Sequence, residues 1–313
     1  MINSDSPPLL LGIDGGGTST QAWLSDPEGK VIGTGVASAS NAKAVGLEAA
    51  RLALGVAILS AFDSAKIEPQ EVEVACFGVA GFDRPEDRKV LEDWNQDEQW
   101  AKKLVLVNDG DLVVAGGTPE GWGVGIIAGT GSIAVARTKD GRKARAGGWG
   151  HLIGDEGSAY TVALEALRLV ARRRDGRELR GDNDELEKRL CGELGVESTD
   201  KIVLALYSSR FDRGAIARLA PSVVEAAGED LDVIDKVLLP AGAALAEMVL
   251  AVHRQLDWPL GPVPLALAGS FLLSSVEVRR GLLTALSSSE VEFVPTSCHE
   301  PVRGALLLAR KAL

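Results

Sequence analysis

Two short glycine-rich segments could bind an anion through their backbone. Each follows an apolar run, and their residues are Asp14, Gly15, Gly16, Gly17 and Thr18 in the first segment and Gly129, Thr130, Gly131 and Ser132 in the second. Because glycine has no side chain, turns of this composition leave their N–H groups accessible, and successive N–H groups form a concave anion site. We therefore predict that the two loops hold a polyphosphate. For either loop alone, the alternative is a plain tight hairpin.

These loops differ from two commoner nucleotide-binding motifs. Neither ends in the Gly-Lys-Ser/Thr sequence of a P-loop, which also needs a helix directly afterwards. Neither is a GxGxxG segment that opens a helix, as a Rossmann site requires. The sequence after the first loop is instead polar and β-branched, which favours a strand.

Two aspartates stand where they could act on a phosphate. Asp14 lies beside the first loop, where its carboxylate could hold a Mg²⁺ ion that neutralises phosphate charge. Mg²⁺ typically binds one or two carboxylates and keeps several waters. Asp109 follows residues 103–107, which we expect to be a buried central strand, and ligands gather at the carboxyl ends of such strands. Asp109 could accept the proton of a hydroxyl that attacks a γ-phosphate. The alternatives are a turn-capping Asp14 and a helix-capping Asp109, although Asp111 is the better cap candidate.

Residues 147–160 form the most specific segment of the chain. They combine several glycines with one Trp, one His and two adjacent carboxylates just before an expected helix. Carboxylates accept hydrogen bonds from the hydroxyls of a sugar. The alternatives are core packing for Trp149 and helix capping for Asp155, but together they do not explain so many glycines. We expect a structural role for His151.

The first part of the chain alternates strands and helices. We expect strands at residues 9–13, 21–25, 30–35, 73–79 and 103–107, and helices at 41–62, 84–99 and 112–116. Strands that alternate with helices are typical of α/β folds.

The opening unit of strand, glycine loop, strand and turn then recurs. Gly129 lies 114 positions after Gly15, and the turn residue Asp140 lies 114 positions after Asp26. We interpret this constant offset as an internal duplication, which predicts two domains of related topology. The alternative is a chance alignment of two glycine-rich hairpins.

The second part of the chain is richer in helices. We expect strands at residues 123–128, 133–137 and 263–268, and helices at 157–174, near 274 onwards and at 301–313. Residues 186–256 are expected to be mostly helical, with interruptions near Gly195, Gly228 and Pro240.

Composition limits the classes of partner. The chain has 313 residues, enough for about two domains, and its 46% hydrophobic content is that of a globular protein. With 33 basic and 44 acidic residues its net charge is −11, so nucleic acid is an unfavourable partner. No apolar run reaches the roughly 20 residues of a membrane span, and we see no signal sequence. Cys76, Cys191 and Cys298 are far apart in sequence, which favours a reducing, cytoplasmic location.

Several strings of the sequence together resemble one family. They are DGGGTST, SASNA, GVAG, VNDG, IAGTGS, GGWGHLIGDEGSAY and LALAGSF. Together they extend over nearly the whole chain, in the same order as in that family. The chain resembles the BadF/BadG/BcrA/BcrD-type ATPase family, and within it the N-acetylglucosamine kinases. These proteins belong to the larger superfamily of sugar kinases, Hsp70 and actin.

The resemblance implies a role for individual residues. The loops at Asp14–Thr18 and Gly129–Ser132 would be the two phosphate sites, with Thr18 and Thr130 in them, and Asp109 would be the general base. The sugar site would be lined by Asn41, Gly148, Trp149, Gly150 and Asp155. The adenosine motif would include Gly269 and Ser270, with Ala217 near the nucleotide.

The resemblance also implies the fold and the reaction. We expect an α/β chain of two ribonuclease H-like lobes, as in actin-like ATPases, with a central cleft. The lobes would span residues 1–116 and 117–300, and the terminal helix at 301–313 is a candidate to pack back on the first. The protein would use ATP and Mg²⁺ to phosphorylate the 6-hydroxyl of an amino sugar, foremost N-acetylglucosamine. The alternatives are a kinase for glucosamine, glucose or another hexose derivative, and an ATP-driven activator or switch. A homodimer is common for such kinases.

Overall fold

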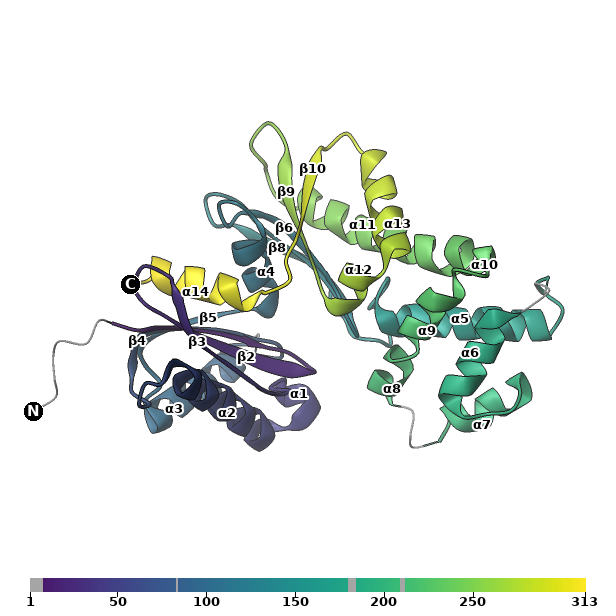
Figure 1. Cartoon of the computed structure of the whole chain (residues 1–313). Coiled ribbons are helices and arrows are strands. Elements are labelled where there is room, and N and C mark those ends of the chain that lie inside the picture. Colours follow the sequence, from purple (N-terminus) through teal and green to yellow (C-terminus); the bar gives the residue numbers. More distant parts are fainter. Residues whose placement is uncertain (1–7, 83, 180–183, 209–211) are drawn as a thin grey trace, which may run out of the picture. The chain divides into compact units, whose positions relative to one another are not determined.

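The computed structural model describes residues 8–82, 84–179, 184–208 and 212–313. It divides into two compact units (Figure 1). The first unit comprises the chain up to Gly123 together with Cys298–Leu313, and the second comprises Val124–Ser297. The chain therefore passes between the units twice.

The first unit is built on a five-stranded mixed sheet with the order β3-β2-β1-β4-β5. Its strands are β1 (Leu10–Gly15), β2 (Ser19–Ser25), β3 (Val31–Ser38), β4 (Val72–Val79) and β5 (Ala101–Val107). The first three strands pair antiparallel, whereas β1, β4 and β5 pair parallel. The carboxyl ends of β1, β4 and β5 consequently lie at the same edge of this sheet.

Helices cover both faces of this sheet (Figure 1). One face packs against α2 (Leu47–Ala65) and α3 (Pro85–Glu98), and the other against α4 (Asp109–Gly117) and α14 (Val302–Lys311). Successive side chains of a strand point to opposite faces, so both sets of positions must be apolar. Leu10 and Cys76 accordingly lie in the core under α14, whereas Leu11 and Phe77 lie in the core under α2.

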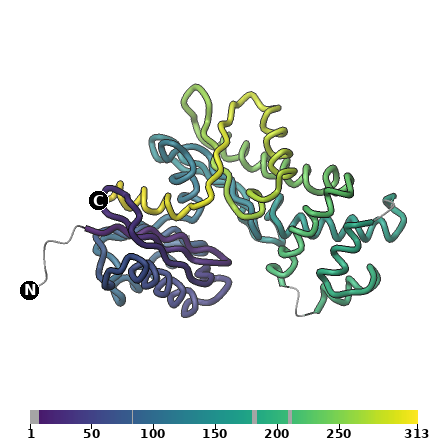
Figure 2. Tube along the Cα trace, viewed as in Figure 1, coloured from purple at the N-terminus to yellow at the C-terminus, as the bar shows by residue number. Residues whose placement is uncertain are grey.

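The last helix of the chain is part of the first unit. Figure 2 shows α14, at the yellow end of the trace, beside the purple strands of the N-terminal sheet. Glycines permit this close approach: a Cβ atom on Gly304 would lie 2.1 Å from the carbonyl oxygen of Leu112 in α4, and one on Gly12 would lie 2.8 Å from the backbone nitrogen of Leu306. A larger residue at either position would separate α14 from its neighbours.

The second unit repeats the strand order of the first. Its sheet has the order β10-β9-β6-β7-β8, so β6, β7, β8, β9 and β10 take the places of β1 to β5. These strands are β6 (Gly123–Ala128), β7 (Ser132–Arg137), β8 (Lys143–Gly147), β9 (Val263–Ala268) and β10 (Phe293–Ser297). The shared order gives the two units the related topology that the offset of 114 positions predicts.

Most helices of the second unit lie in a long connection between β8 and β9. They are α5 (Ala159–Arg174), α6 (Glu185–Leu194), α7 (Ile202–Leu206), α8 (Arg213–Ala217), α9 (Ala220–Ala226), α10 (Leu231–Val233) and α11 (Leu239–Arg254). After β9 follow α12 (Ser270–Ser274) and α13 (Val276–Ser287). Their apolar faces form a core with β6, β7 and β9. The first unit has in the same place only α1 (Ala42–Val45) and α2.

The structure corrects three of the expected elements. The helix expected at 41–62 is broken at Gly46, whose φ of 84° ends α1. Pro240 does not interrupt its helix, because it lies in the first turn of α11, directly after a π-helical turn at Ile234–Leu238. The strand before Asp109 is not a buried central strand: β5 is the edge of its sheet, and residues 104–107 are half-buried.

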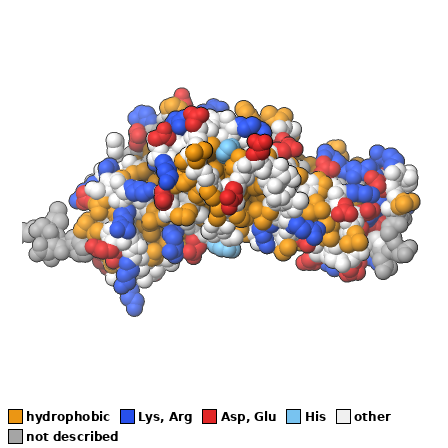
Figure 3. All heavy atoms as spheres, turned by 90° about the horizontal axis from the view of Figure 1, so that it is seen from above, with side chains coloured by type: hydrophobic (Ala, Val, Ile, Leu, Met, Phe, Trp, Pro, Cys, Tyr) orange, Lys and Arg blue, Asp and Glu red, His pale blue; other side chains and the backbone are white. Residues whose placement is uncertain are grey.

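Two strands were missed by sequence reasoning, and both are edge strands. They are β8 and β10, whose residues are mostly half-buried or exposed and therefore lack an apolar run. Among the described residues no helix combines the length and apolar character needed to cross a membrane. On the face seen in Figure 3, acidic and basic side chains are intermingled.

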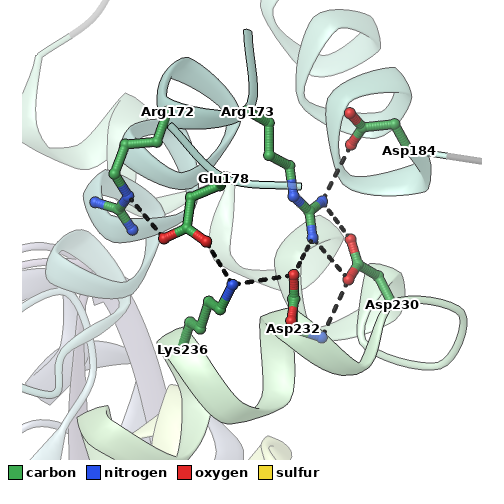
Figure 4. Close-up of polar contacts among 7 residues, drawn as sticks. All are labelled: Arg172, Arg173, Glu178, Asp184, Asp230, Asp232 and Lys236. Carbon is green, nitrogen blue, oxygen red and sulfur yellow. Dashed lines mark hydrogen bonds and ion pairs between the residues drawn. The ribbon is translucent and has the colours of Figure 1, made fainter. Parts of the chain in front are cut away.

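A buried arginine joins α5 to the N-terminal ends of α6 and α10 in the second unit (Figure 4). The side chain of Arg173 in α5 is only 1% exposed, and it binds the carboxylates of Asp184, Asp230 and Asp232. Both terminal nitrogens of Arg173 contact Asp230, at 2.5 and 2.9 Å. These bonds raise the pKa of Arg173, so the guanidinium stays charged.

We predict that Arg173→Met destabilises the protein by about 3–5 kcal/mol, because three partly buried carboxylates lose the buried guanidinium that holds them together. The neighbouring Arg174 is the matched control, since its side chain is 50% exposed and pairs with Asp200 at the surface. Arg174→Met should cost less than about 1 kcal/mol. Denaturant unfolding measures both variants, and equal losses would contradict a special role for the buried cluster.

Candidate active site

The first glycine loop joins β1 to β2 and is fixed at its base. The N–H of Ala80 donates to the carbonyl of Gly15 at 2.8 Å, and the N–H groups of Ser40 and Asn41 both donate to the carbonyl of Gly16 at 3.2 Å. A Cβ atom on Gly15 would lie 2.3 Å from the hydroxyl oxygen of Ser40. The base of the loop therefore requires glycine for packing.

The tip of the first loop is open. Gly17 and Thr18 are exposed, and within the described residues no acceptor receives the N–H of either. A Cβ atom on Gly17 would have no atom within 4 Å, and the φ angle of Gly17 is not positive. Neither packing nor backbone conformation explains this glycine, whereas a ligand that approaches the backbone would explain it.

Asp14 and Asp109 lie near each other at the edge of the first sheet. Asp14 pairs in register with Gly78 of β4, which pairs with Val107 of β5, and Asp109 follows two residues later. The pKa of Asp14 is raised to about 7, mainly because its half-buried position disfavours the charged form and secondly because Asp109 is negative. The sheet thus brings two carboxylates together.

The helix cap beside Asp109 differs from the expected one. The N-cap of α4 is Asn108, whose side chain accepts from the N–H of Gly110 at 2.9 Å. Asp111 is not the cap but the acidic partner three residues later, which accepts from the N–H of Asn108. Asp109 occupies the first position of α4, half-buried, with one carboxylate oxygen 3.0 Å from the N–H of Gly110.

Asn41 has a local structural role in the first unit. Its side chain caps α1 by accepting from the N–H of Lys43 at 3.1 Å. A Cβ atom on Gly81 would lie 2.5 Å from the same oxygen, so Asn41 also lies against the loop that follows β4. The first loop follows the carboxyl end of β1, and Asp109 follows that of β5. Asn41 lies in the segment that is bonded to the first loop.

The second glycine loop joins β6 to β7 and rests on the segment that begins α5. Ser132 donates its N–H to a carboxylate oxygen of Asp155 at 3.2 Å and its hydroxyl to the carbonyl of Glu156 at 2.6 Å. The N–H of Ala159, the first residue of α5, donates to the carbonyl of Gly129 at 2.9 Å. Both hydrogen-bond donors of Ser132 are therefore used within the unit.

The tip of the second loop is also open. Thr130 is exposed, and within the described part of the chain no acceptor receives the N–H of Thr130 or Gly131. A Cβ atom on Gly129 would have no atom within 4 Å, as at Gly17. The N-terminus of α5 lies directly behind this loop, and the dipole of a helix favours an anion at that end.

Asp155 is tied to the second loop and to an arginine. It is 3% exposed, and its second carboxylate oxygen accepts from Arg213 at 2.7 Å. Its φ of 64° is in the left-handed region, which is uncommon for a residue other than glycine. Sequence reasoning missed Arg213, because it lies 58 positions after Asp155 and belongs to none of the motifs.

The glycine-rich part of residues 147–160 presents apolar side chains to solvent. Trp149 is 72% exposed, so it is not a core residue, and Leu152 and Ile153 are exposed beside it in sequence. Gly150 has a φ of 83°, and a Cβ atom there would meet nothing within 4 Å. His151 packs edge-to-face on Tyr160, with ring centroids 5.3 Å apart.

Gly269 and Ser270 follow β9 at the start of α12. Gly269 has a φ of 93°, and a Cβ atom there would lie 2.3 Å from the carbonyl oxygen of Ala128, the last residue of β6. Ser270 is exposed. Ala217 is instead buried in the core of the second unit, so its methyl group offers no open surface.

The donor set at Asp14 and Asp109 is suited to a hard cation. No group of three or more His, Cys, Asp or Glu side chains that could hold a metal ion occurs among the described residues. Mg²⁺, however, needs only one or two carboxylates and fills the remaining positions with water and phosphate oxygens. Such a cation would neutralise the negative charge of the two carboxylates, whose mutual repulsion adds to burial in raising the pKa of Asp14.

The strand order of both units defines the class of protein. Two α/β sheets of the same order are the two ribonuclease H-like lobes of actin-like ATPases, as predicted from the sequence. The solved structure of a ROK family glucokinase from Streptomyces griseus, in complex with glucose and AMPPNP, has this fold. It matches with a TM-score of 0.57 at 18% identity, covering 97% of this chain and 99% of that one.

The chain belongs to the BadF/BadG/BcrA/BcrD ATPase family, whose model matches residues 11–309. An N-acetylmuramic acid/N-acetylglucosamine kinase of Clostridium acetobutylicum is 33% identical over 264 residues, covering 84% of this chain and 85% of the relative. The solved structure of a putative N-acetylglucosamine kinase of Chromobacterium violaceum matches with a TM-score of 0.77 at 26% identity, covering 97% and 99%. The predicted family and the predicted enzyme class, an ATP-dependent sugar kinase, are confirmed by these findings.

We predict that the protein without metal or nucleotide loses stability as the pH rises from 3.8 to about 7, owing to Asp14. A carboxyl whose pKa is raised by folding binds its proton more tightly in the folded state, so deprotonation favours unfolding. Asp14→Asn should remove this dependence and raise the unfolding free energy at pH 8 by up to about 4 kcal/mol, since a tenfold change in proton affinity corresponds to about 1.4 kcal/mol.

Thermal unfolding of both proteins between pH 5 and pH 8 measures the effect, and the difference between them isolates Asp14 from other titrating groups. Asp63→Asn, at an exposed position in α2 of the same unit, is the control for the loss of one negative charge. A difference between wild type and Asp14→Asn that does not change with pH would contradict the raised pKa.

Proposed function

We propose that the chain transfers the γ-phosphate of ATP to the 6-hydroxyl of an amino sugar, foremost N-acetylglucosamine. The choice of sugar is supported by the names of the relative from C. acetobutylicum and of the similar structure from C. violaceum. The observation that carries the proposal is the pair of open loop tips. Gly17 and Gly129 have no structural need for glycine, and N–H groups beside them have no acceptor in the part of the chain described.

The loops would bind the phosphates of ATP. The N–H groups of Gly17 and Thr18 in one unit and of Thr130 and Gly131 in the other are donors without a partner among the described residues. Such N–H groups bind phosphate oxygens and stabilise the charge that moves during phosphoryl transfer. The base of each loop is fixed by hydrogen bonds, so the donors are held in place before the ligand arrives.

Asp109 would act as the general base. As the sugar oxygen forms its bond to the γ-phosphorus, the bond between that phosphorus and the oxygen bridging to the β-phosphate breaks. The hydroxyl proton passes to the carboxylate of Asp109, and ADP leaves with the electron pair of the broken bond. Mg²⁺, held by Asp14, would neutralise phosphate charge when bound.

The sugar would contact Gly148, Trp149 and Gly150, with Asn41 as a further ligand. Asp155, the fifth residue predicted to line the sugar site, is 3% exposed and is bonded to the second loop and to Arg213. The exposure of Trp149 supports this placement, because an aromatic ring in a binding site is often open to solvent until its ligand covers it. Gly150 leaves room beside it, since a Cβ atom there would meet nothing within 4 Å. Gly269 and Ser270 would adjoin the adenosine.

We predict that Asp109→Asn lowers kcat by about 10²- to 10⁴-fold, the range expected for a general base, and leaves the Kd of ATP within threefold. Asparagine keeps the size and the hydrogen-bonding oxygen but cannot accept the proton. Asp111→Asn, two positions along the same helix, is the matched control and should retain activity. If Asp109→Asn turned over at close to the wild-type rate, another group would have to be the base.

The sugar is best identified by ADP release over a panel of hexoses and amino sugars. We expect N-acetylglucosamine to give the highest kcat/KM, above N-acetylmuramic acid, glucosamine and glucose. A higher value for one of the other three would reassign the substrate but keep the kinase. ATP hydrolysis that none of the sugars accelerates would contradict the proposed function.

A further inference from the structure

A buried negative charge lies behind the second phosphate loop. One oxygen of Asp155 accepts the N–H of Ser132, and a Cβ atom on Gly131 would lie 2.7 Å from that oxygen. Asp155 is 3% exposed, so solvent screens its charge poorly. An anion in this position opposes the binding of another anion at the loop unless a cation compensates it.

Arg213 supplies a cation at the same point of the loop. Its Nη2 atom donates to Asp155 at 2.7 Å, and a Cβ atom on Gly131 would lie 2.4 Å from Nη2. Gly131 must therefore be glycine for the guanidinium to lie against the loop backbone. The side chain of Arg213 is 38% exposed, so part of it faces solvent beside the loop.

No other acceptor among the described residues receives the remaining N–H donors of Arg213. Its Nε atom is buried without a hydrogen-bond partner among the described residues, and nothing described accepts from Nη1. A guanidinium has five N–H donors in a planar fork that matches a phosphate group. A cation with unused donors thus lies beside the open N–H groups of Thr130 and Gly131.

We propose that Arg213 binds a phosphate group of the nucleotide at the second loop, and that Asp155 holds its guanidinium in position. This inference rests on the proposed function in so far as that function places a nucleotide at the loop. Asp155 is then a positioning residue: its left-handed backbone, between Gly154 and Glu156, lets one carboxylate bond both the loop and the arginine.

The direct test is the binding of ADP to the full-length chain, measured by calorimetry without sugar. Arg213→Met should raise the Kd of ADP by about 10- to 100-fold, the range expected for hydrogen bonds to a charged group. Arg213→Lys should lose less, because it keeps the charge without the fork. Arg142→Met is the matched control, since Arg142 forms exposed ion pairs with Asp140 and Asp257 in the same unit.

Adenosine separates a phosphate contact from a structural defect. If Arg213 contacts a phosphate, Arg213→Met should leave the Kd of adenosine within threefold while weakening ADP. An equal loss for adenosine and ADP, or an unchanged Kd for ADP, would overturn the proposal. Thermal unfolding of each variant reports whether the fold is retained.

A double variant separates a phosphate ligand from a simple neutraliser of Asp155. Asn at position 155 can still accept the N–H of Ser132 but carries no charge. If Arg213 binds phosphate, Asp155→Asn combined with Arg213→Met should stay at least tenfold weaker for ADP than wild type. Recovery of wild-type affinity in the double variant would show that Arg213 only cancels the charge of Asp155, and the proposal would fail.

The steady-state constants distinguish this inference from the assignment of the sugar site. Asp155→Asn should raise the KM of ATP more than the KM of the sugar, because the carboxylate is bonded to the loop and to Arg213. A rise in the sugar KM alone would contradict the inference and leave the kinase intact. Normal ADP binding that depends on Arg213, in a protein that phosphorylates no sugar, would uphold the inference and contradict the proposed function.

Discussion

Backbone N–H groups without an internal acceptor are the constraint on which the site depends. A loop that presents such N–H groups at its tip needs its other backbone groups satisfied. Otherwise the carbonyl groups of the loop would accept hydrogen bonds from the N–H groups at the tip. In the first unit the carbonyls of Gly15 and Gly16 accept from Ala80, Ser40 and Asn41. In the second unit the donors of Ser132 are bonded to the segment before α5, and the carbonyl of Gly129 accepts from the first residue of α5. Each loop is held at its base and left open at its tip.

The two units use different residues to fix the base of the loop and leave its tip open. In the first loop the packed glycine is Gly15, which faces the hydroxyl of Ser40, and the open glycine is Gly17. In the second loop the packed glycine is Gly131, which faces Asp155 and Arg213, and the open one is Gly129. The two units share strand order, and the first carries the carboxylate pair Asp14 and Asp109 beside its loop. The shared strand order thus provides the scaffold, and the residues placed beside the two loops differ.

Much of the fold and of the candidate site could be predicted from the sequence, because glycine loops and apolar strands are local signals. The loops, the duplication and most strands follow from residues adjacent in the chain. The position of β5 at a sheet edge, and the strands β8 and β10, do not, because edge strands need no apolar run. Arg213 also lacks a local signal: its partners Asp155 and Gly131 lie 58 and 82 positions earlier. The roles assigned to individual site residues stay predictions, which the experiments above address.

The return of α14 has a consequence for synthesis of the chain. Leu306, Ala305 and Ala309 fill one face of the N-terminal sheet against Leu10 and Cys76, yet they are translated only after the second unit. Until they leave the ribosome, α4 covers only part of that face, and the nascent first unit stays incomplete while the whole second unit is made. Loss of residues 299–313 would therefore damage the first unit, most of which is encoded far upstream of them.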